Sequence, residues 1–148
     1  MNLGVFLFIL NMQRDQINVT MIKDLSGLYK TEPIMAGCLA IILFSMAGIP
    51  PLAGFVGKLL ILNVVVDSNL FFLATIAVLT SVVAAFYYIR MVKSIFFDEP
   101  TEELDILTNN QSKLLMILFS FFNLTVILYP QFFLNLSASI ALSLFALK

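Results

Sequence analysis

Two features with chemical consequences meet in one apolar stretch of the sequence. Pro50 and Pro51 remove two adjacent backbone N–H donors, so an unbroken α-helix cannot pass through them. Lys58 follows seven residues after Pro51. A broken helix and a buried charge are each costly in hydrocarbon. Their coincidence predicts a functional site rather than a simple membrane anchor.

Lys58 is the one charged residue between residues 34 and 66. It lies about 12 Å from the end of that segment at 1.5 Å per residue, too far for its side chain to reach the interface. Desolvation disfavours the charged form of a lysine, so such a side chain can take up and release a proton. We expect Lys58 to act in proton transfer. The apolar segments contain no Asp or Glu, so a counter-charge has to come from another chain.

The break itself supplies polar groups beside the lysine. With Gly48, the two prolines leave carbonyls before the break and N–H groups after it, and these must meet water or protein. A Gly/Pro kink alone commonly serves only packing, and a tyrosine pair at a helix end suits interfacial anchoring. The lysine therefore carries the functional argument, and five residues are candidate support for it: Ser45, Gly54, Gly57, Tyr87 and Tyr88.

Composition places the chain in the membrane class and excludes several functions. It is 61% hydrophobic and 11% charged, with a mean hydropathy of +1.03. Histidine is absent and Cys38 is the single cysteine, which excludes histidine-based catalysis and metal sites and an intramolecular disulfide. A net charge of −1 gives no electrostatic basis for nucleic-acid binding. We expect neither a metal nor a bound cofactor on this chain.

The elements that must hold the lysine follow from segment lengths. A straight helix over residues 34–66 would be roughly 50 Å long, against a hydrocarbon core of roughly 30 Å. We expect two half-helices, 34–47 and 52–66. The predicted fold is an all-α membrane protein with about three transmembrane helices, one of them discontinuous at Gly48–Pro51. A single domain, 1–148, is divided into a partial helix (1–13), a polar loop (14–33), the broken helix (34–66), a transmembrane helix (70–92), an acidic loop (94–112), a transmembrane helix (113–129) and an interfacial helix (131–148).

Local signals refine these elements. Thr31 suits an N-cap with Pro33 in the first turn, and Ser112 suits the cap of the helix after the acidic loop. The last helix carries one polar stripe, which favours an interfacial position over a further span: Gln131, Asn135, Ser139 and Ser143. Four Asn-x-Ser/Thr sequences are attributed to chance, two of them because they lie in apolar segments: Asn18, Asn110, Asn123 and Asn135.

Basic residues predict the orientation in the membrane. The turn at 67–69 contains none, whereas loops 14–33 and 90–113 together contain six: Arg14, Lys23, Lys30, Arg90, Lys93 and Lys113. This positive-inside bias puts both loops in the matrix or cytoplasm, and the turn and the C-terminus on the opposite side.

Residues 24–62, with the run LFSMAGIPPLAGFVGKLLIL, and residues 81–92, SVVAAFYYIRMV, resemble the C-terminal part of the antiporter-like subunits of respiratory complex I. Within them they are most similar to the subunit 2 type of NADH:ubiquinone oxidoreductase, since the subunit 4 type has a glutamate at the position of Lys58. The resemblance implies that the break belongs to a discontinuous helix whose lysine transfers protons. It also implies membrane-arm partners, surrounding lipid and a mitochondrial inner membrane, with a bacterial-type membrane as the alternative.

Length is where the chain departs from this family. It resembles about the last three helices and half of the one before, which implies a split or truncated subunit with a separate chain carrying the N-terminal helices. NADH, FMN, iron–sulfur clusters and ubiquinone would bind to other chains of the complex. Two alternatives remain open: a subunit of a cation/proton antiporter or membrane hydrogenase, and a structural scaffold without pumping.

Overall fold

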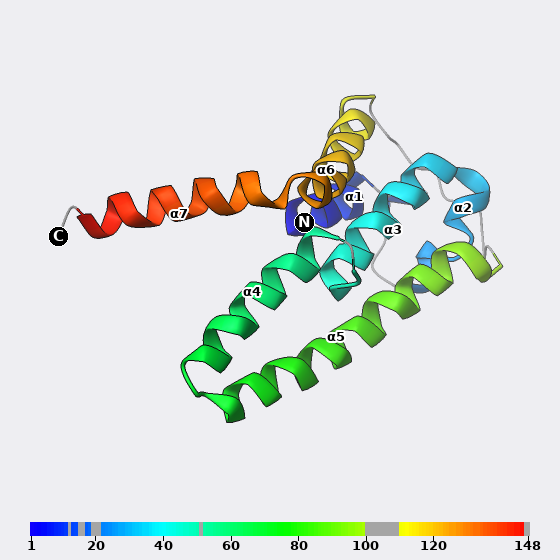
Figure 1. The fold of residues 1–148 in the computed structure, drawn as a ribbon. Helices are drawn as coiled ribbons and strands as arrows, with labels where there is room; N and C mark the ends of the chain where they lie inside the picture. The colour runs from blue at the N-terminus through cyan, green and yellow to red at the C-terminus, as the bar shows by residue number, and fades with distance from the viewer. Residues whose placement is uncertain (12, 15–16, 19–21, 51, 100–109, 147–148) are drawn as a thin grey trace.

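The computed structural model is a bundle of helices joined by turns and longer loops (Figure 1). It describes residues 1–11, 13–14, 17–18, 22–50, 52–99 and 110–146. The predicted all-α membrane fold is confirmed, with one short addition in the first loop, a ribbon of two residues per strand. In order, the elements are α1 (Asn2–Asn11), β1 (Gln13–Arg14), β2 (Ile17–Asn18), η1 (Ile22–Leu25), α2 (Leu28–Thr31), α3 (Pro33–Ala47), α4 (Ala53–Asp67), α5 (Phe71–Phe97), α6 (Asn110–Leu128) and α7 (Pro130–Ala146).

Helix α3 forms the centre of the bundle. It contacts α1, α5 and α6, and its residues are apolar on every face, as expected for a helix with neighbours all round. A Cβ built on Gly4 of α1 would lie 2.8 Å from Cδ1 of Ile42, so α1 and α3 approach closely at this point. The most deeply buried side chains come mainly from α3: Met35, Leu39, Ile42 and Leu43.

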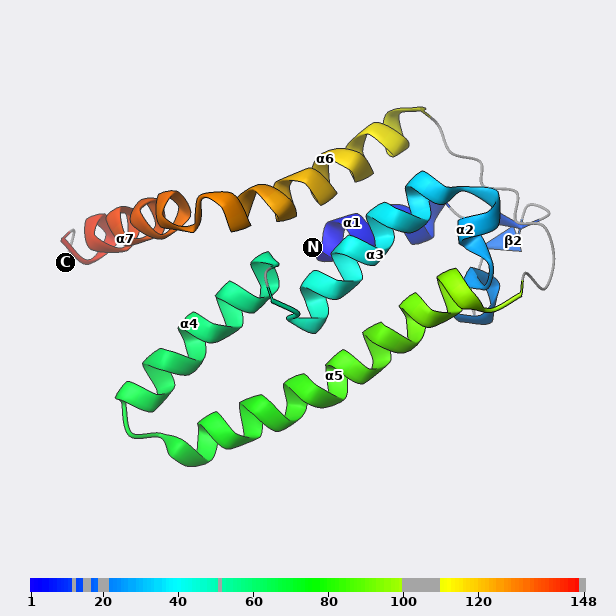
Figure 2. The same ribbon diagram turned by 45° about the vertical axis from the view of Figure 1, so that its right-hand side comes forward.

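The chain breaks after α3 and continues as α4, and both half-helices lie beside α5 (Figure 2). Each half has 15 residues, about 22 Å at 1.5 Å per residue, so neither crosses a bilayer alone. Helix α5 has 27 residues and is the one described helix long and apolar enough to span a membrane by itself. Because α3 ends at Ala47 and α4 begins at Ala53, the predicted break in the helix is confirmed.

Helix α5 extends further than expected. The sequence prediction ended it at residue 92 and began the acidic loop at Ser94, but the helix continues to Phe97. Ile95 is fully buried, Tyr29 of α2 packs on Phe96 with ring centroids 5.2 Å apart, and the Ser94 carbonyl accepts a hydrogen bond from the N–H of Gly27 at 3.2 Å. Packing by the first loop stabilises this last turn. Residues 100–109 of the acidic loop lie outside the described residues.

Two predicted helix starts also differ from the structure. Glu32, not Thr31, is the N-cap of α3, and Pro33 takes the first helical position. The Thr31 hydroxyl instead donates to the Leu28 carbonyl at 3.1 Å, inside the short α2. Helix α6 begins at Asn110, so Ser112 lies within it rather than at its cap.

The last helix, α7, leaves the bundle (Figures 1 and 2). The hydroxyls of its polar stripe bond to their own helix, Ser139 to Leu136 and Ser143 to Ile140. Apolar residues between the members of the stripe, such as Ile140, are exposed as well. An interfacial position for α7 stays a prediction.

Candidate functional site

The break begins with a left-handed glycine. Gly48 has φ 85° and ψ 36°, and its N–H donates to the carbonyls of Phe44 and Ser45, while that of Ile49 also reaches Phe44. This pattern ends a helix by satisfying its last carbonyls from within. The backbone then passes through Pro50 to Leu52, and the helix restarts at Ala53. Pro51, also predicted to break the helix, lies outside the described residues.

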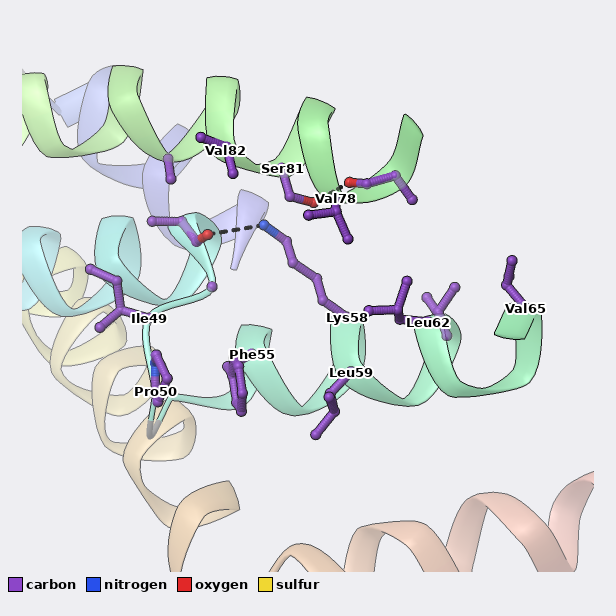
Figure 3. Close-up of a pocket in the computed structure, with 15 residues that line it drawn as sticks. Ile49, Pro50, Phe55, Lys58, Leu59, Leu62, Val65, Val78, Ser81 and Val82 are labelled. Carbon is purple, nitrogen blue, oxygen red and sulfur yellow. Dashed lines mark hydrogen bonds between the residues drawn. The ribbon is translucent and has the colours of Figure 1, made fainter. Parts of the chain in front are cut away.

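Lys58 points back across the break to the end of α3. Its Nζ donates to the carbonyl oxygens of Met46 and Ala47, each at 3.1 Å. Figure 3 shows the side chain reaching back to the end of α3. These are among the carbonyls that the break leaves without helical partners. The C-terminus of a helix also carries a partial negative charge, equivalent to roughly half an electron. The lysine is therefore stabilised by backbone dipoles of its own chain.

Gly48 is required here for a second reason. A Cβ built on it would lie 3.1 Å from Cδ and 3.2 Å from Nζ of Lys58. Any side chain would press on the lysine in addition to the strain of its positive φ. The glycine thus ends α3 and leaves room for the ammonium group at the same place.

Ser45 joins three helices at the break and is fully buried. Its Oγ accepts a hydrogen bond from the N–H of Gly54 at 3.1 Å and lies 3.0 Å from Oδ1 of Asn123 in α6. Gly54 approaches α3 so closely that a Cβ there would overlap the Ser45 carbonyl oxygen. Ser45 and Gly54, both predicted as support, therefore lie together and hold α3 against the first turn of α4.

The other predicted supporting residues lie elsewhere. Gly57 is exposed, and a Cβ placed on it would have nothing within 4 Å, so it makes no close helix contact. Tyr87 is exposed on α5 and stacks edge-on against Phe86, with ring centroids 5.8 Å apart. Tyr88 is half-buried against the core. Neither tyrosine is among the residues that line the lysine's cavity, which favours the anchoring interpretation.

A cavity of about 500 Å³ adjoins Lys58, between the break, α4 and α5. Figure 3 shows the lysine with Ile49 and Pro50 on one side and Val78, Ser81 and Val82 of α5 on another. Among the described residues that line it, Lys58 is the one that carries a charge, and most of the others are apolar. The cavity leaves space next to the ammonium for water or a partner's side chain.

Asn123 is a polar residue that the sequence prediction missed. It is 4% exposed, in the second half of α6, and the sequence marks it only as part of a chance glycosylation motif. The available signal was an amide inside an apolar helix, because such a group needs a hydrogen-bond partner across a helix interface. Which partner it has is a matter of tertiary packing and could not be read from the sequence.

Ion pairs within the described part of the chain lie away from the break. Glu32 and Lys113 approach to 2.8 Å and link the starts of α3 and α6. Lys93 lies 4.0 Å from Asp98, and their side chains are 70% and 45% exposed. Among these residues no group of His, Cys, Asp or Glu could hold a metal ion. The remaining candidate chemistry is therefore that of the lysine at the break.

The structure is that of a membrane protein: an apolar bundle of helices with a discontinuous helix at its centre. A lysine inside the bundle is hydrogen-bonded to the end of the first half of that helix. The comparisons with known proteins agree with this class. The chain belongs to the family described as NADH:quinone oxidoreductase/Mrp antiporter, TM, which matches residues 1–84. The predicted family resemblance is confirmed at this level.

Similar proteins are longer than this chain. NADH-quinone oxidoreductase subunit N of Rhodospirillum rubrum is 51% identical over 117 residues, covering 79% of this chain and 24% of that protein. Subunit N of Beijerinckia indica is 43% identical over 148 residues, covering 98% and 30%. A chain of the structure entitled "Respiratory complex I from Thermus thermophilus with bound Aureothin" shares the fold, with a TM-score of 0.75 at 24% identity over 86% of this chain and 29% of that one. The chain thus spans less than a third of each.

Proposed function

We propose that this chain forms part of a proton-translocating membrane-arm subunit of respiratory complex I. In this proposal Lys58 takes part in the proton transfer that is coupled to NADH:ubiquinone electron transfer. The observation that carries the proposal is the pair of 3.1 Å hydrogen bonds from Nζ to the Met46 and Ala47 carbonyls at the break. Membership of the family and the names of the relatives support the same function.

The geometry suits a group that changes protonation state. An ammonium has three N–H donors, and the two carbonyls accept two of them. The third donor remains for water or a partner's side chain in the adjoining cavity. After a proton leaves, the neutral amine still has two N–H groups for the same carbonyls, and its lone pair is free to accept the next proton. The site can therefore hold Lys58 in both states without a large movement.

Partners complete the proposed site. The matched stretch covers only 24% and 30% of the two relatives, so their remaining helices provide the natural source of a counter-charge for Lys58. We propose that helices corresponding to these, other membrane-arm subunits and lipid surround the part of the chain that contains Lys58. NADH, FMN, iron–sulfur clusters and ubiquinone would bind elsewhere in the complex, and the chain itself would carry out no redox chemistry.

The compartment follows from the same proposal. The sequence favours a mitochondrial inner membrane with the loops 14–33 and 94–112 in the matrix. The two subunit N relatives are bacterial, which supports the alternative of a bacterial inner membrane with these loops in the cytoplasm. In either case the turn between α4 and α5 and the C-terminus would lie on the opposite side.

The test is Lys58→Ala in membranes that contain the assembled complex. Because proton transfer by a positioned group commonly contributes factors of about 100 or more, we expect proton pumping and coupled NADH:quinone turnover to fall by about tenfold or more per assembled complex. Lys93→Ala is the matched control, since it removes an exposed lysine at the end of α5. Unchanged pumping in Lys58→Ala would favour the scaffold alternative.

The transport alternative is separated by the proteins that co-purify with this chain. Redox subunits and quinone reductase activity are expected with it. A complex of Na⁺/H⁺ antiporter subunits or of hydrogenase subunits in their place would overturn the assignment to complex I, although not the role of Lys58.

A further inference from the structure

We propose that Asn123 of α6 is a positioning residue for Lys58. It acts through Ser45, whose hydroxyl links the end of α3 to the first turn of α4. The inference rests on the proposed function of Lys58 and assigns the hydrogen-bond chain that keeps its ammonium at the break. Three helices take part, and each link is a contact between described groups.

The first link fixes the amide of Asn123. Its Nδ2 donates to the Phe119 carbonyl of its own helix at 2.9 Å, which leaves Oδ1 facing Ser45 at 3.0 Å. Both side chains are buried, at 4% and 0% exposure, so water cannot replace either partner. A buried polar group without a partner is costly, so this pair is strongly favoured to stay together.

The second link orients the hydroxyl of Ser45. The hydroxyl has one hydrogen and two acceptors within 3.0 Å, Oδ1 of Asn123 and Sδ of Met1, and an amide oxygen accepts more strongly than a thioether sulfur. With its hydrogen on Asn123, the oxygen presents its lone pairs to other donors. The N–H of Gly54 donates to it at 3.1 Å. Asn123 therefore prepares Ser45 to accept the first turn of α4.

The third link transmits this position to Lys58. Residues four apart on a helix share a face, so Lys58 lies one turn beyond Gly54 on the side that faces α3. Its acceptors, Met46 and Ala47, directly follow Ser45 in the chain. A shift of α4 against α3 at the Ser45–Gly54 contact would therefore move Nζ away from both carbonyls.

The interface between α3 and α6 offers a matched control. Ser120 donates to the Cys38 carbonyl at 3.1 Å, and both groups are buried. Cys38 is seven residues before Ser45, roughly 10 Å along α3. Ser120→Ala thus removes a buried hydrogen bond between the same two helices without touching the break.

The experiment compares three variants in the assembled complex, with turnover and pumping normalised to the amount of complex. Asn123→Leu has a similar volume but no acceptor, and we expect a loss of roughly tenfold, equivalent to the removal of about one hydrogen bond in a buried site. Asn123→Gln keeps both the amide oxygen and the amide N–H groups, so it is expected to retain more activity than Asn123→Leu. Ser120→Ala is expected to leave the activity unchanged. Full activity in Asn123→Leu, or an equal loss in Ser120→Ala, would overturn the proposal.

Two further measurements separate this proposal from the proposed function. Asn123→Leu added to Lys58→Ala should cause no further loss, because the amide acts through the lysine. A structure of the Asn123→Leu complex should show that Nζ no longer bonds to both carbonyls, and this readout is valid even if Lys58→Ala is itself silent. If Asn123→Leu does not assemble, Ser45→Ala removes the hydrogen bond to Asn123 together with the one from the Gly54 N–H, and the expected loss is equal or larger.

Discussion

At the scale of residues, the lysine has a partner that its sequence context does not show. The apolar segments contain no carboxylate, which predicted an uncompensated charge. The structure instead places two peptide carbonyls at 3.1 Å from Nζ, at the negative end of α3. The partial charges of these peptide dipoles attract the side chain less strongly than a full carboxylate would. A counter-charge from a partner would then add to the carbonyls rather than replace them.

Gly54→Ala tests the close approach of the two half-helices. The added methyl overlaps the Ser45 carbonyl oxygen, so α4 has to move away from α3, and overpacking of this kind costs roughly 1–3 kcal/mol. We expect lower pumping per assembled complex because Nζ is withdrawn from its carbonyls. Gly57→Ala is the control on the same helix, since its methyl enters open space and alanine favours helix. Equal losses in both variants would contradict the close-contact argument.

The helix break at Gly48 and Pro50 was the feature best predicted from the sequence, because the effects of these two residues on the backbone are local. Gly48 and Pro50 end one helix whatever surrounds them, and the structure breaks there. The role of Asn123 was not predictable, because an amide in an apolar helix shows only that some partner exists. Ser45 was proposed for its hydroxyl, but its three partners come from different parts of the chain.

At the scale of elements, the sequence prediction was wrong at those helix ends whose position depends on contacts with neighbouring segments. The basic residues Arg90 and Lys93 resemble an interfacial helix end. The helix nevertheless continues to Phe97, because η1 and α2 cover its last turn and bury Ile95. The start of α3 is likewise set by a contact with α6, through Glu32 and Lys113, rather than by a side-chain cap.

The ion pair between Glu32 and Lys113 makes a prediction for assembly. Both side chains are about one-third exposed, at 31% and 34%, so the pair should contribute on the order of 1 kcal/mol or less. Glu32→Lys and Lys113→Glu should each lower the amount of assembled complex, and the double exchange should restore it. Lys93→Glu is the control, because its 4.0 Å pair is largely exposed. Failure of the double exchange to restore assembly would show that the two charges act independently.

At the scale of the whole molecule, α3 is surrounded by its own chain whereas α4 and α5 are not. Large apolar side chains are exposed along α4 and α5, including Ile61, Phe72 and Val82. Apolar faces of this extent require lipid or other helices. Within the proposed complex, the remaining helices of the subunit would cover the side that contains the Lys58 cavity, and lipid the rest. The hydropathy of the segments predicted this environment, but which helix has an enclosed position depends on the bundle.

The orientation of the chain can be tested through the two ends of α5. This helix is about 40 Å long at 1.5 Å per residue, so Ser68 before it and Glu99 after it would lie on opposite sides of a bilayer core of roughly 30 Å. Both residues are exposed, and the one native cysteine, Cys38, is buried and can be replaced by serine. In sealed vesicles with the cytoplasmic or matrix face outward, a membrane-impermeant maleimide should label this chain in Glu99→Cys but not in Ser68→Cys. Vesicles of the opposite orientation should reverse the result. Labelling of both variants from one side would show that α5 does not cross the membrane, and the reverse pattern would show that the six basic residues of the loops do not set the orientation.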